Sequence, residues 1–221
     1  MASRVSFACR ASVARWIATA AILLCTLAVA QPKAPLILVV GDSISAAYGL
    51  PAGAGWTTLL QKRLVAEHYP HRVVNASISG DTSASGRARL SLLLGQYRPA
   101  ITVIELGGND GLRGGSLDGL KANLDAMVAA AQRAGSRVLL LGMRLPPNYG
   151  PEYVRRFDAT FPEVAGKGKA AVVPFLFEGF GDNDAMFQAD RIHPVAAAQP
   201  KLLDNVWLVL KPLLDATGKS R

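Results

Sequence analysis

Short runs of apolar residues alternate along the chain with longer segments whose apolar residues recur at the spacing of a helix. The runs that predict buried strands are 36–40, 73–76, 101–106, 137–141 and 171–175. The segments that predict helices are 55–68, 84–95, 117–134, 150–165 and 195–214. Strands covered by helices on both faces are continuous apolar runs, and alternation of the two element types is typical of parallel sheets. The pattern therefore predicts an α/β fold with a doubly wound, flavodoxin-like parallel sheet of five strands.

Small and polar residues gather where the predicted strands end. Parallel strands all end at one edge of their sheet, and ligands bind beyond that carboxyl edge. The segments concerned are 41–45, 75–82, 107–111 and 190–194. These segments are far apart in the sequence, but we expect them to meet at the carboxyl edge and form the functional site.

Three residues of these segments have the chemistry of nucleophilic catalysis. The hydroxyl of Ser43 is a weak nucleophile until a base removes its proton, and His193 can be that base. Asp190 precedes His193 by three residues, so a single turn can bring its carboxylate to the other ring nitrogen. The hypothesis is a catalytic triad of Ser43, His193 and Asp190.

Hydrogen-bond donors for a developing oxyanion come from the same strand ends. We expect a helix to begin at Ser43, where backbone N–H groups are free to face the oxyanion. Gly80 can supply a second backbone N–H with no side chain in the way, and Asn109 can supply a side-chain N–H. The predicted oxyanion hole therefore consists of Ser43, Gly80 and Asn109.

Neighbouring residues of the same types are weaker candidates for the triad. Ser45 is a rival nucleophile, but two residues beyond Ser43 it would already lie inside the expected helix. Asp42 is expected to brace the turn rather than act as an acid. Asp110 could supply the triad carboxylate, but we expect its side chain to point elsewhere.

The two remaining histidines, His68 and His71, precede the second predicted strand. This position lies at the opposite edge of the sheet, so we expect both side chains to face solvent. No pair of histidines has the spacing of metal ligands, and the two cysteines, Cys9 and Cys25, lie within the first thirty residues. The sequence therefore predicts no metal site.

With these motifs the sequence resembles the SGNH, or GDSL-like, hydrolases. The four residues that name the family correspond here to Ser43, Gly80, Asn109 and His193, and Asp190 corresponds to the third member of the triad. Within the family, the sequence is similar to the periplasmic multifunctional acyl-CoA thioesterases, lysophospholipases and arylesterases. The stretches that carry this similarity are 41–43, 74–82, 105–114, 144–150 and 192–194, within an overall resemblance over 36–212.

The resemblance implies a three-layer α/β/α fold, no cofactor, and hydrolysis of acyl-CoA thioesters, lysophospholipids and simple aryl or alkyl esters. It also implies that an acyl groove is lined by the loops after Gly80 and Asn109 and by the loop 146–149. Tyr149 and Met143 are candidates for contact with the acyl chain, and ordinary packing is the equal alternative. Two other functions stay open: a carbohydrate acetylesterase with the same triad, and a non-catalytic flavodoxin-like module that binds a phosphate-bearing ligand.

The first thirty residues have the layout of a secretory signal peptide. Three arginines and no acidic residue precede an apolar run, 17–29, that ends in small residues at 28–30. The run is shorter than the about 20 residues of a membrane span, and an uncleaved N-terminal anchor is the alternative. Cleavage near Ala30 would leave one domain, 31–221, in the periplasm of a bacterium or secreted from it.

Composition and charge exclude further classes of function. A chain that is 50% hydrophobic and 18% charged is not disordered. The net charge of +8 includes the three arginines of the signal peptide, and the other basic residues are dispersed rather than interleaved with aromatic residues. We therefore expect no nucleic-acid partner. The expected partners are small acyl ester or thioester substrates, including lysophospholipid at a membrane surface, and the expected state is a monomer.

Overall fold

Five parallel strands make up the sheet of the computed structural model, which describes residues 34–218. Their bounds are β1 (Leu36–Gly41), β2 (Arg72–Asn75), β3 (Ile101–Glu105), β4 (Arg137–Leu141) and β5 (Ala171–Val173). The strands lie in the order β2-β1-β3-β4-β5. Val39 of β1 pairs with Asn75 of β2 on one side and with Val103 of β3 on the other, in parallel register. The predicted five-stranded parallel sheet is confirmed.

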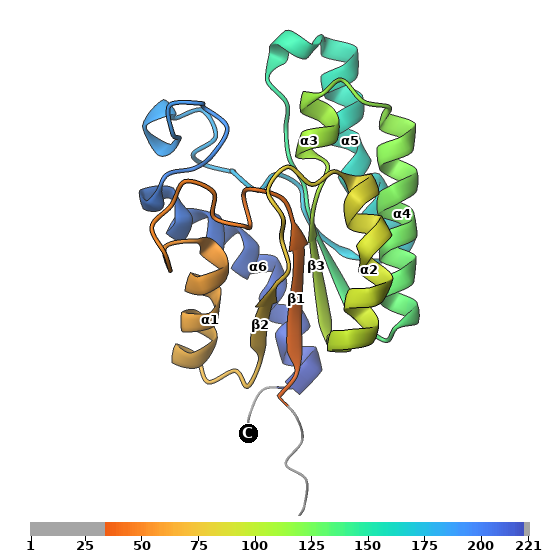
Figure 1. Ribbon diagram of the computed structural model, residues 1–221, viewed down its shortest axis with the longest axis vertical. Coiled ribbons are helices and arrows are strands. Elements are labelled where there is room, and N and C mark those ends of the chain that lie inside the picture. The colour runs from red at the N-terminus through yellow and green to blue at the C-terminus, as the bar shows by residue number, and fades with distance from the viewer. Residues whose placement is uncertain (1–33, 219–221) are drawn as a thin grey trace, which may run out of the picture. The chain divides into compact units, whose positions relative to one another are not determined.

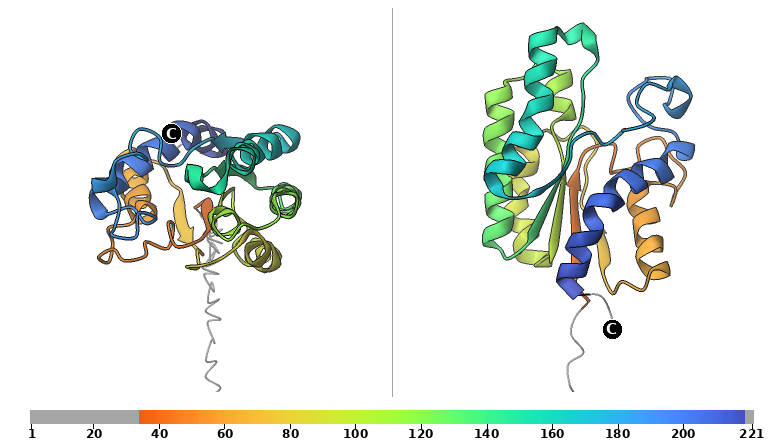
Figure 2. Two further views of the ribbon diagram at one scale, coloured as in Figure 1. Left: turned by 90° about the horizontal axis from the view of Figure 1, so that it is seen from above. Right: turned by 180° about the vertical axis from the view of Figure 1, so that it is seen from behind.

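Helices cover both faces of the sheet and give the described residues three layers (Figures 1 and 2). One face carries α1 (Trp56–Ala66) and α6 (Gln199–Gly218). The other carries α2 (Ser83–Tyr97), α4 (Leu117–Arg133) and α5 (Pro151–Gly168). The short helices are α3 (Gly108–Leu112) and the 3-10 helices η1 (Pro147–Tyr149), η2 (Asp184–Met186) and η3 (Ala196–Ala198).

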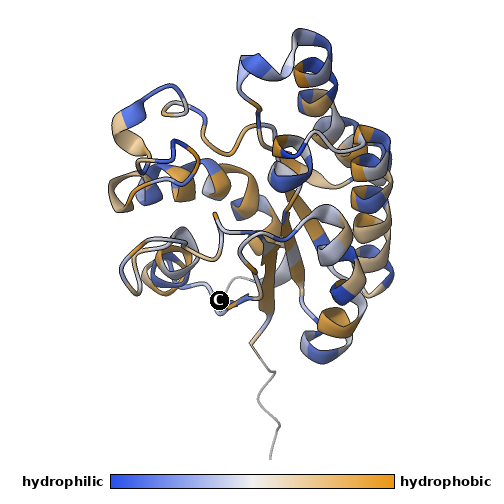
Figure 3. Cartoon of the chain, turned by 45° about the horizontal axis from the view of Figure 1, so that its top comes forward, coloured by the Kyte–Doolittle hydropathy of each residue, from blue (hydrophilic) through white to orange (hydrophobic). Residues whose placement is uncertain are grey.

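The central strand β1 contributes to two separate hydrophobic cores because its side chains alternate between the faces of the sheet. Ile37 and Val39 pack with α1 and α6, whereas Leu38 and Val40 pack with α2, α4 and α5. All four side chains are fully buried. Figure 3 shows the resulting apolar character of the sheet between helices that are polar on their outer sides. A strand buried on both faces explains the continuous apolar run in the sequence.

The segment between β1 and α1 differs from the prediction. No helix begins at Ser43; the chain runs through a series of turns, and the first helix begins at Trp56. The N–H of Tyr48 bonds to the carbonyl of Ser43 at 3.0 Å, and Ala47 has a φ of 60°. A positive φ stops helical geometry after one turn. Ser43 therefore lies in a tight turn rather than at a helix terminus.

Two further elements differ from the expected ones. The segment 107–111 has the sequence of a turn, but at Gly108 it enters helix α3, which is only 5 residues long. The last helix begins at Gln199 rather than at residue 195, because η3 precedes it. Neither difference moves a strand end, so the loops after β1, β2 and β3 still gather at the carboxyl edge, at the top of the sheet in Figure 1.

The predicted signal peptide, residues 1–30, lies outside the described residues. Residues 34–218 belong to one compact unit. No helix within that range is long and apolar enough to cross a membrane.

Candidate active site

Ser43, His193 and Asp190 form a continuous hydrogen-bonded chain at the carboxyl edge of the sheet. Ser43 Oγ lies 2.8 Å from His193 Nε2, although the two residues are 150 positions apart. His193 Nδ1 lies 2.7 Å from Asp190 Oδ2. With Nδ1–H donating to the carboxylate, Nε2 carries no proton and can accept that of the serine hydroxyl. The structure thus brings together the three residues of the predicted triad.

The carboxylate of Asp190 also shapes the loop that carries His193. Its Oδ1 accepts hydrogen bonds from the backbone N–H of Ile192 at 2.9 Å and of His193 at 3.0 Å. Burial acts to raise the pKa of Asp190, but the hydrogen bonds from the His193 side chain and from these two N–H groups outweigh it and lower the pKa to about 2. Asp190 is therefore ionised at neutral pH.

The predicted oxyanion donors surround Ser43. Ser43, Gly80 and Asn109 all line a cavity of about 320 Å³ together with His193. Gly80 has a φ of +83°, a conformation that favours glycine, and it lies in the loop between β2 and α2. Within residues 34–218, the backbone N–H groups of Ser43 and Gly80 donate to no other residue, which leaves both available to a ligand.

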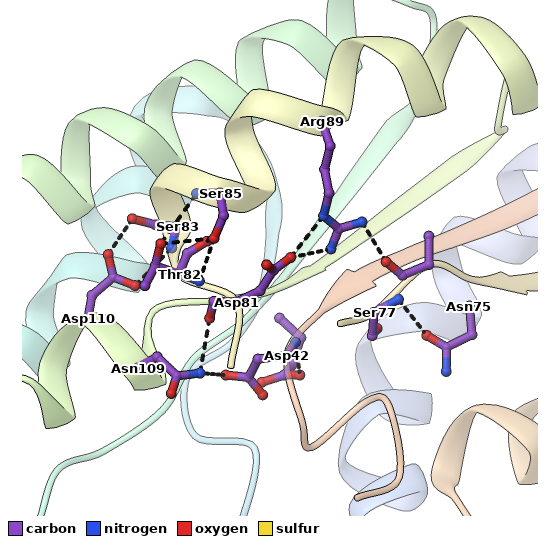
Figure 4. Close-up of polar contacts among 12 residues, drawn as sticks. Asp42, Asn75, Ser77, Asp81, Thr82, Ser83, Ser85, Arg89, Asn109 and Asp110 are labelled. Atoms are coloured by element: carbon purple, nitrogen blue, oxygen red, sulfur yellow. Dashed lines mark hydrogen bonds and ion pairs between the residues drawn. The ribbon is translucent and has the colours of Figure 1, made fainter. Parts of the chain in front are cut away.

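The side chain of Asn109 is held in place by two acceptors. Its Nδ2 donates to Asp42 Oδ2 at 3.1 Å and to the backbone carbonyl of Asp81 at 3.0 Å (Figure 4). Asp42 also accepts from the N–H of Ile44 at 3.0 Å, so it braces the turn of Ser43 as predicted. The amide is thus fixed at the edge of the cavity, with both of its hydrogens engaged.

The loop that carries Gly80 is fastened to α2. Asp81 is almost fully buried and accepts two contacts from the guanidinium of Arg89, at 2.8 Å from Nε and 2.7 Å from an Nη. Arg89 also donates to the carbonyl of Ala76 at the start of the same loop. The hydrogen bond from Nε, the ion-pair contact of the Nη with the same carboxylate oxygen and the bond to Ala76 together give the loop a defined path.

Of the alternative candidates, Asp42 lines the Ser43 cavity, whereas Ser45 and Asp110 line neither cavity. Ser45 is fully buried and donates its hydroxyl proton to Glu105 at 2.7 Å, so it does not face a substrate; it lies in the turns, not in a helix as expected. Asp110 accepts from the N–H and the hydroxyl of Ser83 at 2.8 and 2.6 Å (Figure 4). Its carboxylate therefore points to the start of α2 and not to His193, in agreement with the prediction.

The prediction for His71 is wrong. His68 is exposed, as expected, but His71 is only 1% exposed and its Nε2 lies 2.8 Å from Thr217 Oγ1 in α6. His71 thus occupies a core position of the kind that apolar residues usually fill, and its ring packs beside that of Tyr69. Both histidines precede β2, at the amino end of the sheet, far along the strands from Ser43.

Two residues of the site had not been singled out in the sequence. Glu105 ends the apolar strand β3, and its Oε2 accepts from the N–H groups of Asp42 and Ser45 beneath the nucleophile turn. The sequence feature that could have indicated Glu105 is an acidic residue at the end of an otherwise apolar strand. Tyr48 covers the imidazole of His193 with ring centroids 4.7 Å apart, and only its place in the loop after Ser43 could have indicated it.

Burial controls the protonation of the carboxyl groups beneath Ser43. It raises the pKa of Asp42 to about 6, against the opposing effect of the Ile44 N–H and of positive charge on His193. It raises the pKa of Glu105 well above its ordinary value, and the neighbouring charge of Asp42 acts in the same direction. Among residues 34–218, no three His, Cys, Asp or Glu side chains are grouped to hold a metal ion.

A second, larger cavity of about 710 Å³ adjoins the first. The two share Gly108, Leu112, Met143 and Ile192 among their lining residues. The walls of the larger one are rich in aromatic and proline residues, which are Phe175, Phe177, Phe180, Phe187, Pro146 and Pro147. Tyr149 lines neither cavity and donates its hydroxyl to the carbonyl of Leu112 at 2.9 Å, so its role is packing.

The fold and the site together define an α/β protein with a serine, a histidine and a carboxylate assembled at the carboxyl edge of a parallel sheet. The chain belongs to the GDSL-like lipase/acylhydrolase family, whose model matches residues 39–199. The resemblance noted in the sequence is thereby confirmed.

Named relatives and solved structures support the same assignment. The chain is 59% identical over 184 residues to "Esterase TesA" of Pseudomonas aeruginosa. The matched residues cover 83% of this chain and 92% of the relative. It is 40% identical over 182 residues to "Thioesterase 1/protease 1/lysophospholipase L1" of Escherichia coli strain K12, covering 82% and 86%. The crystal structure of TesA matches with a TM-score of 0.79 and 59% identity over 80% of this chain and 99% of the other. That of AlinE4, an SGNH-hydrolase family esterase, matches with a TM-score of 0.69 and 36% identity over 82% and 97%.

Proposed function

We propose that this protein is a serine hydrolase that cleaves acyl esters and thioesters through an acyl-enzyme. The observation that carries the proposal is the chain from Ser43 Oγ through His193 to Asp190, with distances of 2.8 and 2.7 Å, at the wall of a cavity. In this assignment Ser43 is the nucleophile, His193 the general base and acid, and Asp190 the group that holds the imidazole.

The first half of the reaction forms the acyl-enzyme. His193 Nε2 takes the hydroxyl proton of Ser43 while Oγ attacks the acyl carbonyl carbon, and the ionised Asp190 stabilises the imidazolium. The carbonyl oxygen gains the negative charge of the tetrahedral intermediate and accepts from the N–H groups of Ser43 and Gly80 and from Asn109 Nδ2. The bond to the alcohol or thiol then breaks, and the leaving group receives the proton from His193.

The second half returns the enzyme to its starting state. Water gives a proton to His193 as its oxygen attacks the acyl carbonyl, and the oxyanion occupies the same three donors. The carboxylic acid leaves as Ser43 Oγ recovers its proton from His193. Apart from the attacking water, every step uses side chains and backbone N–H groups of this chain, with no cofactor.

The substrates that we propose are aryl esters, acyl-CoA thioesters and lysophospholipids, taken up by a monomer. The curated relatives named esterase, arylesterase, and thioesterase and lysophospholipase support this range. The larger cavity supports it as well, because an aromatic wall continuous with the Ser43 cavity suits the methylene chain of an acyl group. A lysophospholipid would be taken from a membrane surface, and cleavage near Ala30 would release the enzyme into the bacterial periplasm or medium.

A series of p-nitrophenyl esters from acetate to palmitate, extended with an acyl-CoA and a lysophospholipid, tests this function. We expect hydrolysis of the longer esters and a fall of about 10⁴-fold or more in kcat for Ser43→Ala. Ser91→Ala, which alters an exposed serine on α2, is the matched control and should keep wild-type activity. Activity on acetate alone would favour a carbohydrate acetylesterase, and equal activity of wild type and Ser43→Ala would overturn the proposed mechanism.

A further inference from the structure

A set of buried polar side chains lies beneath Ser43, and Glu105 is at its centre. Glu105 is 0% exposed, and its Oε2 accepts from Ser45 Oγ at 2.7 Å and from the N–H groups of Asp42 and Ser45 at 3.3 Å each. A side chain on Gly41 would begin 2.7 Å from the same oxygen, so the glycine leaves room for the carboxyl group. One carboxyl oxygen therefore holds the residues on both sides of Ser43.

The same set reaches the loop that carries His193. Ser45 Oγ accepts from the indole Nε1 of Trp56 at 3.2 Å. The backbone N–H of Trp56 donates to Gln199 Oε1 at 3.0 Å. Gln199 begins α6, and its Nε2 lies 3.5 Å from the carbonyl of Pro194, the residue after His193. Trp56 and Gln199 are also buried. The nucleophile turn and the histidine loop are thus joined through the core rather than only across the active site.

A second branch reaches the oxyanion hole. The Asp42 N–H donates to Glu105 Oε2 at 3.3 Å, a hydrogen bond from Glu105 acts to lower the pKa of Asp42, and Asp42 Oδ2 accepts from Asn109 Nδ2 at 3.1 Å. Asp42 is 3% exposed, so neither carboxyl group is solvated enough to ionise freely beside the other. Glu105 therefore touches groups that place the nucleophile, the base and an oxyanion donor.

The proton between the two carboxyl groups belongs to Glu105. Its Oε1 is buried and has no donor among the described residues, and a carboxylate oxygen can only accept. Burial raises the pKa of Glu105 well above its ordinary value, and the neighbouring charge of Asp42 acts in the same direction. A protonated Glu105 can donate to Asp42, which stays ionised and accepts from Asn109. Two ionised carboxylates in this space would be strongly unfavourable.

We propose that Glu105 is a positioning residue for hydrolysis: held as a neutral carboxylic acid, it sets Ser43 Oγ against His193 Nε2 and, through Asp42, fixes the direction of the Asn109 amide. This inference rests on the proposed function. Glu105 is fully buried and lines neither cavity, so it is not placed to contact a substrate. Its loss should therefore reduce kcat and leave KM nearly unchanged.

Two substitutions distinguish three roles of Glu105: a neutral hydrogen-bonding acid, a charged carboxylate, and a residue that only fills space. Glu105→Gln keeps an oxygen for Ser45 and an N–H for Asp42, so kcat should stay within about threefold of wild type. Glu105→Leu keeps most of the volume without the bonds, so kcat should fall about 100-fold, as expected for a displacement on the order of 1 Å at the nucleophile. The pH dependence of kcat/KM should be the same for wild type and Glu105→Gln, because no charge is removed.

A matched control distinguishes positioning from general loss of stability. Thr102 lies near the opposite end of β3 from Glu105 and makes a buried hydrogen bond of 2.7 Å with Ser136. Thr102→Val removes this bond and should leave kcat unchanged. Ser45→Ala removes the link from Glu105 to Trp56 by a smaller change, and should lower kcat about tenfold at constant KM even if Glu105→Leu fails to fold. Circular dichroism and thermal melts establish which variants are folded.

The possible results separate clearly. Wild-type kcat in folded Glu105→Leu, or in Ser45→Ala, would overturn the positioning role while the proposed function stands. A Glu105→Gln variant as impaired as Glu105→Leu, with the acid limb of kcat/KM moved to lower pH, would show that the charge matters and overturn the neutral acid. A folded wild-type protein without ester hydrolysis would overturn the proposed function itself.

Discussion

At the scale of single residues, the Asn109 amide donates to two acceptors before any substrate binds. Asp42 Oδ2 and the carbonyl of Asp81 take its two hydrogens. An oxyanion that forms at Ser43 carries more negative charge than the Asp81 carbonyl, so it can take over one of these hydrogen bonds as the intermediate develops. The bond to Asp42 stays and keeps the amide aimed. In the proposed mechanism, the donor is thus more strongly used in the transition state than in the free enzyme.

We expect Asn109→Ala to lower kcat about 100- to 1,000-fold, as loss of one oxyanion donor does in serine hydrolases. KM should change little, because the ground-state carbonyl does not need this donor. Steady-state kinetics on a p-nitrophenyl ester measure both constants.

Asn123→Ala is the control for that variant, because it removes an amide on α4 that bonds to Ser83 and not to the cavity. A fall in kcat of less than tenfold for Asn109→Ala, or an equal fall for both variants, would exclude Asn109 from the oxyanion hole.

At the scale of elements, a buried histidine joins the start of β2 to the end of α6. His71 Nε2 meets Thr217 Oγ1, and nearby the hydroxyl of Tyr69 donates to Asp215 at 2.7 Å. Burial lowers the pKa of His71, so the folded state binds its proton less readily than the unfolded chain does. Below a pH of about 6.5 the unfolded state therefore holds more protons, and stability decreases as the pH falls.

His71→Gln should reduce this acid-dependent loss of stability, because glutamine stays neutral. Thermal melts at pH 7.5 and 5 should show a smaller decrease in Tm for the variant than for wild type, by a difference on the order of 1–3 °C. His68→Gln changes an exposed neighbour and should behave as wild type. An identical pH dependence in wild type and His71→Gln would show that His71 does not titrate in this range.

The elements differ in how far the sequence specifies them. β1, β3 and β4 are predictable because residues buried on both faces, such as Val39 and Leu140, leave a continuous apolar run. Helix α3 is not, since Gly108 and Asn109 favour turns and five residues show no periodicity. The turn at Ser43 depends on a positive φ at Ala47, an alanine that gives no local signal.

The candidate site was predictable to a similar degree. Ser43, Gly80, Asn109, Asp190 and His193 stand in recognisable motifs, and the structure places all five around one cavity or in its hydrogen-bonded chain. Buried partners that support the motifs carry no such pattern. A histidine such as His71 has the same letter whether it lies in the core or in solvent, and only tertiary packing decides between them.

At the scale of the whole described unit, the strand order places the site. The chain turns outward in opposite directions from β1 and β3, so the loops after these two strands separate and leave a crevice at their carboxyl ends. Ser43 follows β1, Asn109 follows β3, and the loop after β5 brings in His193 from the far edge. The larger aromatic cavity begins where these loops meet, so under the proposed function the acyl chain and the reacting carbonyl would occupy adjoining cavities.

The central claim, that Ser43 is an activated nucleophile, is tested most directly with a fluorophosphonate and peptide mass spectrometry. The folded protein should gain one adduct, on the peptide that contains Ser43, and the adduct should be absent after thermal unfolding and in Ser43→Ala. The rate of labelling should fall steeply in His193→Ala, because the base that takes the serine proton is gone. An unlabelled folded protein, or an adduct on Ser45 in place of Ser43, would contradict the account.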